Sequence, residues 1–282
     1  MMKLNWRAAL TALFFVTLLF SKTLSFANGN QVETVLYLGK GNNQPLIVGL
    51  GGSEGGNAWT NDRWKATRDK FLAQGYAFLA VGYFGAKGTP KQLDRIEIEN
   101  IYNAIQETLK HPQVRDQGVA VIGGSKGAEL ALLMASYYPS ISCVVSIVGS
   151  HAAFPALTFW ASTSSWTFKG KEIPYVPMPW SAVPSAITGN LRRAFEIMLE
   201  DEEAVQKAMI KVENIKGPIL LVSAKKDEMW PSTEMSELVI QRLKKNKFPF
   251  ASQHLAIDGG HLQPLKHFDE IIEFLIKQYP AN

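Results

Sequence analysis

Residues 119–134 contain the serine whose surroundings best fit a nucleophile. The stretch reads VAVIGGSKGAELALLM, an apolar run followed by Gly-x-Ser-x-Gly and a helix-forming segment. This order predicts a sharp strand-to-helix turn with Ser125 at its apex, and it needs Gly123 and Gly127 because a Cβ at either place would collide with a neighbouring element. The first N–H groups of the helix would face a developing oxyanion. We therefore expect a catalytic Ser125 rather than an ordinary tight turn.

A serine nucleophile needs a base, and the base needs an orienting carboxylate. Asp227 lies four residues after a predicted strand at 219–223, and His261 follows the predicted last strand at 252–257 and two glycines. In the α/β-hydrolase order the acid follows a late strand and the histidine follows the last one. We therefore predict that Asp227 orients His261 and that His261 activates Ser125.

Other titratable residues compete less well for these roles. Glu228 is the nearest rival of Asp227, and Asp258 fits a turn former before the histidine. His151 follows the predicted strand at 143–148 at the carboxyl edge of the sheet, where substrates bind, so its position makes it a candidate to face the substrate. The remaining histidines lie in predicted helices, caps or strands: His111, His254 and His267.

The loop at residues 49–59, GLGGSEGGNAW, predicts the second half of an oxyanion hole. Its glycines let the backbone approach a substrate, so the backbone N–H of Ser53 is expected to act with that of Lys126. Gly52, His151 and Trp230 are the candidate substrate-binding residues. GGSEGG matches neither a Walker A loop nor a dinucleotide fingerprint, and no His or Cys pair has metal-ligand spacing, so we expect no cofactor and no metal.

Apolar β-rich runs alternate with segments of helical period. Several of the runs are apolar on consecutive residues, as in strands covered on both faces. Strands are predicted at 32–38, 46–50, 77–82, 119–123, 143–148, 219–223 and 252–257, and helices at 63–74, 93–110, 126–137, 232–245 and 266–278. This alternation predicts the α/β class with a mostly parallel, doubly wound sheet.

Residues 152–212 interrupt the alternation. The first part, to about Val183, is rich in Trp, Pro and Ser and includes Trp160, Trp166 and Trp180, and a more helical, acidic piece follows. A long insertion near the carboxyl ends of a sheet is usually a lid or binding loop, and a hydrophobic ligand would cover its aromatic side chains. We expect this insertion to be a lid over the substrate; the alternative is a separately packed decoration, a segment that makes no contact with the substrate.

The first 27 residues resemble an export signal. Lys3 and Arg7 precede an apolar run from Ala8 to Phe20 that is short for a membrane span, and small residues at 25 and 27 suit cleavage. We expect an exported, periplasmic or secreted protein without a stable membrane span, the alternative being an uncleaved anchor. We expect residues 28–282 to form a single α/β-hydrolase domain. Three of the basic residues that contribute to the net charge of +4 lie in this leader. The rest of the chain therefore has no basic excess of the kind that indicates nucleic-acid binding. The single cysteine cannot pair within the chain.

Several motifs together resemble a known family. In chain order they are GGSEGG, FLAQGYAFLAVGYFG, GGSKGAELALLMAS, ISCVVSIVGS, KKDEMW and GGHLQP. The chain resembles the C-terminal α/β-hydrolase domain of acyl-CoA thioester hydrolases and bile acid-CoA:amino acid N-acyltransferases. The resemblance implies an α/β-hydrolase fold with Ser125 as nucleophile, Asp227 as acid and His261 as base. The amino-acid-conjugating members use cysteine, so a serine favours transfer to water.

We therefore expect a serine hydrolase that cleaves small-molecule acyl thioesters or carboxylic esters through an acyl-enzyme. Four alternatives stay open: acyl transfer to an amine, a dienelactone-hydrolase-like esterase, a peptidase, and a non-catalytic binding protein of the same fold. The acyl chain, the leaving group and the oligomeric state are not specified by the sequence.

Overall fold

The computed structural model describes residues 32–281, so the predicted leader lies outside the described residues. Its main sheet has seven strands in the order β1-β3-β2-β5-β6-β9-β10. The first is antiparallel to its neighbour and the other pairs are parallel. The strands are β1 (Glu33–Tyr37), β2 (Gln44–Leu50), β3 (Ala77–Gly82), β5 (Val114–Gly124), β6 (Ile141–Ile147), β9 (Ile219–Ala224) and β10 (Ser252–Ile257).

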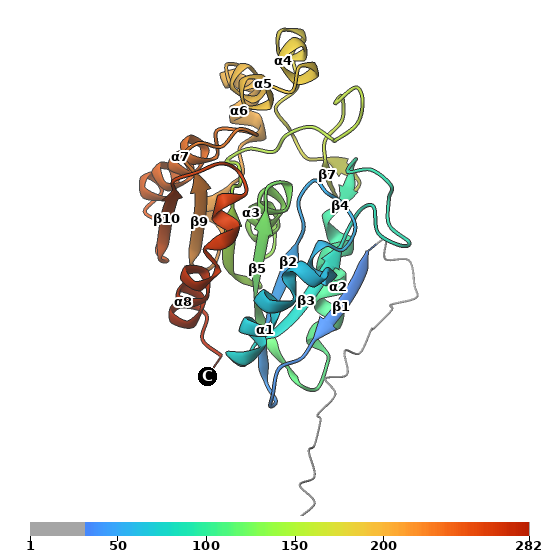
Figure 1. Cartoon of the computed structure of the whole chain (residues 1–282), viewed down its shortest axis with the longest axis vertical. Helices are drawn as coiled ribbons and strands as arrows, with labels where there is room; N and C mark the ends of the chain where they lie inside the picture. Colours follow the sequence, from blue (N-terminus) through green and yellow to red (C-terminus); the bar gives the residue numbers. More distant parts are fainter. Residues whose placement is uncertain (1–31, 282) are drawn as a thin grey trace, which may run out of the picture.

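Helices cover both faces of this sheet (Figure 1). They are α1 (Lys65–Ala73), α2 (Ile98–Leu109), α3 (Lys126–Tyr137), α7 (Ser232–Lys245) and α8 (Phe268–Gln278). Successive side chains of a strand point to opposite faces, so Val48 of β2 joins the core under α2, α3 and α7, while Ile47 joins the core under α1 and α8. The inner strands β2, β3 and β9 are buried along their whole length, and burial on both faces explains why they are mostly apolar. The predicted α/β class and mostly parallel sheet are confirmed.

The insertion between β6 and β9 folds back on itself. Its first residue, Ala152, forms a β-bridge with Met209 near its end, and its aliphatic and aromatic side chains share a separate core with Trp230. It contains β7 (Trp166–Phe168), β8 (Lys171–Glu172), α4 (Val183–Ile187), α5 (Leu191–Met198) and α6 (Glu202–Ala208). A short strand, β4 (Ile96–Glu97), pairs with β7. Figure 1 shows α4, α5 and α6 together at one end of the molecule.

Single 3-10 turns join several of these elements: η1 (Ala58–Thr60), η2 (Asp62–Trp64), η3 (Trp180–Ala182), η4 (Val212–Asn214) and η5 (Gln263–Lys266). Among residues 32–281, no helix is long and apolar enough to cross a membrane. The tips of the insertion carry solvent-exposed aromatic side chains: Phe159 is 89% exposed, Trp160 is 72% exposed and Trp180 is 82% exposed. Whether these tips close over a substrate stays a prediction.

Candidate active site

Ser125 lies on a strained turn between β5 and α3. Its φ of 54° and ψ of −120° are rare for a residue with a side chain. The turn is closed by backbone packing, because a Cβ on Gly123 would lie 2.0 Å from the carbonyl oxygen of Gly127. A Cβ on Gly127 would lie 2.2 Å from the carbonyl oxygen of Gly51. Only glycine fits at 123 and 127, as the sequence pattern predicts.

His261 and Asp227 form a buried pair. The imidazole Nδ1 lies 2.8 Å and 3.0 Å from the two carboxylate oxygens of Asp227. A carboxylate only accepts, so in the neutral imidazole this contact requires the proton on Nδ1 and makes Nε2 the acceptor. Asp227 also accepts hydrogen bonds from the backbone N–H groups of Met229 and Trp230 at 3.0 Å and 3.3 Å. This pairing agrees with the spacing argument, and its catalytic role stays a prediction.

The loops after β9 and β10 hold this pair in place. Lys226 donates its backbone N–H to the Gly259 carbonyl at 2.9 Å, which joins the two loops. Gly259 has a φ of 135°, so the predicted glycine bend before His261 is present. The side chain of Glu228 accepts the backbone N–H of His261 at 2.9 Å, so this rival of Asp227 fixes the histidine's backbone.

Asp258 and Arg192 both contact the loop that carries Asp227. Asp258 is exposed and pairs with Lys226 at 2.9 Å, consistent with a turn residue. The Arg192 guanidinium, from α5 of the insertion, donates to the backbone carbonyl of Asp227 at 3.0 Å. The sequence analysis did not find Arg192, because no local motif indicates that an inserted helix returns to this loop.

A cavity of about 380 Å³ contains the Ser125 and His261 side chains. We call it the Ser125 cavity. Three aromatic rings form its apolar wall, with ring centroids 4.8–5.8 Å apart: Trp59, Trp64 and Phe268. Charged side chains at its rim are those of Glu54, Arg63 and Glu228. These rim and wall residues come from loops, 3-10 turns and the start of α8, and no local sequence pattern indicates that these segments converge.

The glycine-rich loop lines the same cavity. Gly52 is buried against the turn, since a Cβ there would lie 3.2 Å from the Cβ of Ser125. Ser53 is exposed at the cavity. Lys126 begins α3, so its backbone N–H is one that a helix leaves without an internal partner. The structure therefore brings Gly52, Ser53 and Lys126 together around Ser125, and the oxyanion role of these N–H groups stays a prediction.

Two residues predicted to bind substrate do not line the Ser125 cavity. Trp230 is 3% exposed, and its indole N–H donates to the Val148 carbonyl at 2.9 Å. Its ring lies behind the His261 ring, with the centroids 6.3 Å apart. Trp230 therefore supports the histidine from within the protein.

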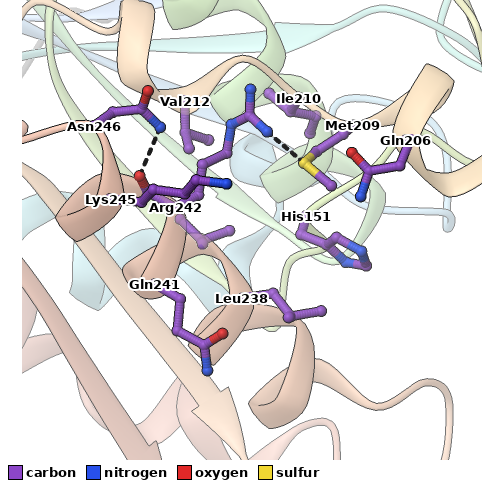
Figure 2. A pocket seen from close by; sticks show the side chains of 11 residues that line it. His151, Gln206, Met209, Ile210, Val212, Leu238, Gln241, Arg242, Lys245 and Asn246 are labelled. Atoms are coloured by element: carbon purple, nitrogen blue, oxygen red, sulfur yellow. Dashed lines mark hydrogen bonds between the residues drawn. The ribbon is translucent and has the colours of Figure 1, made fainter. Parts of the chain in front are cut away.

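His151 lies at a second cavity, of about 400 Å³, between α6, η4 and α7 (Figure 2). The His151 carbonyl accepts the backbone N–H of Ile210 at 3.0 Å, next to the Ala152–Met209 bridge that joins the two ends of the insertion. Burial lowers the pKa of His151 to about 4. Among residues 32–281 its buried Nδ1 has no hydrogen-bond partner. The structure therefore does not bring His151 to Ser125. We call this second hollow the α7 cavity.

Solved structures of known proteins share this fold. A puromycin-hydrolysing peptidase of Mycobacterium tuberculosis matches 93% of this chain and 40% of its own, with a TM-score of 0.63 and 16% identity. An esterase of Pyrococcus furiosus matches 92% of this chain and 91% of its own, with a TM-score of 0.61 and 15% identity. These likenesses establish the α/β-hydrolase fold.

Sequence comparisons identify the family. The peroxisomal succinyl-coenzyme A thioesterase of Mus musculus is 30% identical over 174 residues, which cover 60% of this chain and 38% of the relative. The acyl-coenzyme A amino acid N-acyltransferase 1 of Mus musculus is 26% identical over 191 residues, 67% of this chain and 43% of the relative. The chain thus matches less than half the length of these relatives. The family model described as BAAT / Acyl-CoA thioester hydrolase C terminal matches residues 96–278, and the protein belongs to this family.

Proposed function

We propose that this protein is a serine hydrolase of acyl thioesters or carboxylic esters. The observation that carries the proposal is one cavity that holds Ser125 on its strained turn and His261 on the Asp227 carboxylate. The named functions of the relatives, acyl-coenzyme A thioesterases and N-acyltransferases, support acyl transfer as the reaction class. A serine nucleophile favours water as the acceptor.

The proposed reaction begins when Ser125 Oγ attacks the acyl carbonyl while His261 Nε2 takes its proton. Asp227 keeps the imidazole oriented and stabilises its charged form. The backbone N–H groups of Lys126 and Ser53 stabilise the oxyanion of the tetrahedral intermediate. As the intermediate collapses, the histidine returns the proton to the leaving thiolate or alkoxide. Water, deprotonated by His261, then attacks the acyl-enzyme carbonyl, and the histidine returns that proton to Ser125 Oγ as the carboxylic acid leaves.

The lining of the cavity indicates how a substrate would lie. The wall of Trp59, Trp64 and Phe268 suits an apolar acyl chain, which gains free energy by leaving water. The rim that carries Glu54 and Arg63 suits a polar leaving group that extends toward solvent. We therefore propose an apolar acyl group and a polar leaving group.

Export is proposed from the pattern of residues 1–27 alone. An exported enzyme would rarely meet cytosolic coenzyme A, so the identity of the leaving group depends on where the protein is located. The mass of the mature N-terminus, measured on protein from cell fractions, shows whether the leader is cleaved; an intact Met1 would contradict the proposal.

The function is tested with p-nitrophenyl esters of graded chain length beside acyl-CoAs assayed by thiol release. Ser125→Ala should lower kcat by at least roughly 10³-fold with the fold retained. Ser136→Ala is the matched control, because Ser136 lies on the same helix and its hydroxyl donates to the Leu133 carbonyl at 2.7 Å within that helix. A fluorophosphonate should label Ser125 in the wild type. Near-full hydrolysis by Ser125→Ala would overturn the proposal.

A further inference from the structure

A buried ion pair directly follows the proposed nucleophile. Lys126 Nζ lies 2.7 Å from Glu129 Oε1, and the two side chains are only 5% and 0% exposed. The same ammonium group donates to the Phe154 carbonyl in the insertion at 3.3 Å. Burial lowers the pKa of Lys126, and the Glu129 carboxylate opposes that shift. A buried ion pair seldom adds net folding stability, because desolvation offsets the attraction.

Glu129 connects the first turn of α3 to two other segments. Its Oε1 also accepts the indole N–H of Trp166, on β7, at 2.6 Å. Its Oε2 accepts the hydroxyl of Ser150, after β6, at 3.2 Å. Trp166 is fully buried, so its ring position is fixed by packing as well as by this bond.

Trp166 extends the network to the glycine-rich loop. Its ring packs against Tyr83, with the centroids 5.8 Å apart. The Tyr83 hydroxyl donates to the Gly51 carbonyl at 2.5 Å. Burial, with the nearby carboxylates of Glu54 and Glu129, raises the pKa of Tyr83 well above its usual value, so it stays a donor. Gly51 lies two residues before Ser53.

The network therefore links the two backbone segments on either side of Ser125. One begins at Lys126 and the other holds Gly51 and Ser53. These segments also meet directly, because the Gly51 carbonyl oxygen lies 2.2 Å from where Gly127 would carry a Cβ. Any change in the position of Gly51 would alter the spacing of the Ser53 and Lys126 N–H groups.

We propose that Lys126, Glu129, Trp166 and Tyr83 form a positioning network that sets the spacing of the two oxyanion donors. The inference rests on the proposed function and deepens it, since it assigns these buried side chains a role in kcat. A hydrogen bond to an oxyanion depends steeply on geometry, so a small displacement weakens transition-state binding more than substrate binding.

Two tyrosines at opposite ends of β3 allow a matched test. Tyr83→Phe removes the hydroxyl that donates to the Gly51 carbonyl. Tyr76→Phe removes a similarly buried hydroxyl, which donates to the Tyr279 carbonyl at 2.9 Å away from the Ser125 cavity. We expect Tyr83→Phe to lower kcat by roughly ten-fold or more with KM changed less than about two-fold. Tyr76→Phe should keep both constants within about two-fold.

A second variant and a transition-state analogue separate positioning from general damage. Trp166→Phe removes the donor to Glu129 and keeps an aromatic ring beside Tyr83, so it should lower kcat in the same way. The double variant with Tyr83→Phe should lose less than the product of the single losses, because both act on one network. A trifluoromethyl ketone forms an oxyanion adduct with Ser125, and its affinity should fall by the same factor as kcat/KM.

The outcomes also distinguish this inference from the proposed function. Absence of Ser125-dependent hydrolysis and of fluorophosphonate labelling in the wild type would overturn the function and this inference with it. An active wild type, with Tyr83→Phe folded by circular dichroism and no slower than Tyr76→Phe, would overturn the positioning network alone. A rise in KM at unchanged kcat, or an unchanged inhibitor affinity, would do the same.

Discussion

The Ser125 cavity and the α7 cavity have similar volumes, about 380 Å³ and 400 Å³, but differ in how their polar groups are held. In the Ser125 cavity, a strained turn, a glycine-rich loop and two loops after β9 and β10 converge, and the imidazole of His261 is oriented by Asp227. In the α7 cavity, the buried Nδ1 of His151 has no partner among the described residues. Orientation of the polar groups, rather than the size of a hollow, marks the candidate for catalysis.

The largest expected effect comes from disturbing that orientation. Asp227→Asn should lower kcat by roughly 10³- to 10⁴-fold, because an amide can hold the imidazole with the wrong nitrogen protonated. Initial rates with a p-nitrophenyl ester measure the loss. Asp258→Asn, which removes an exposed carboxylate next to the same histidine loop, is the control and should stay within about two-fold. Equal rates for the two variants would contradict the role of Asp227.

The turn itself should be sensitive to a single methyl group. Gly123→Ala places a Cβ 2.0 Å from the Gly127 carbonyl oxygen, so we expect a loss of about 4 kcal/mol in the free energy of unfolding. Urea denaturation measures it. Gly124→Ala has no atom within 4 Å of its added Cβ and should lose less than about 1 kcal/mol. Similar stabilities would show that the turn relaxes easily.

Protonation of His151 in the α7 cavity should lower the free energy of unfolding, and replacement of His151 should leave kcat unchanged. The pKa of His151 is about 4 in the fold against 6.5 for a free histidine, so the unfolded chain binds more protons between these values. Stability should therefore be complete above pH 6.5 and should fall by on the order of 3 kcal/mol as the pH drops toward 4.

His151→Gln should flatten this pH dependence, measured by urea denaturation across the window, and should keep kcat within about two-fold. His111→Gln is the matched control and should retain the wild-type slope. A His151→Gln variant with strongly reduced kcat would show that His151 contributes to the reaction. That result would contradict the proposed difference between the two cavities.

The smallest effect on stability is expected at the tips of the insertion. Phe159 and Trp160 are exposed and contact each other, so replacing both with serine should change the free energy of unfolding by less than about 0.5 kcal/mol. If the insertion is a lid, KM for long-chain esters should rise while KM for acetate esters stays constant. An unchanged KM across the series would favour the decoration.

The sequence predicted the sheet, the Ser125 turn and the Asp227–His261 contact better than the residues around them. The strands at 77–82 and 252–257 and the helices at 126–137 and 232–245 have the predicted bounds, because continuous apolar runs and helical period are local signals. Glu129 and Tyr83 were not singled out, since their partners are far apart in the chain. The predicted position of His151 rested only on the strand before it. Its backbone bond to the distant Ile210 instead holds it at the α7 cavity.

The insertion leaves the main sheet after β6 and re-enters it at β9, and these strands are immediate neighbours in the parallel ladder. Ala152 and Met209, near its two ends, are themselves bridged. Because this bridge closes the insertion at its base, the residues between Ala152 and Met209 can change without altering the register of β6 and β9. The insertion can therefore differ in length or sequence while the sheet and the Ser125 turn keep their positions.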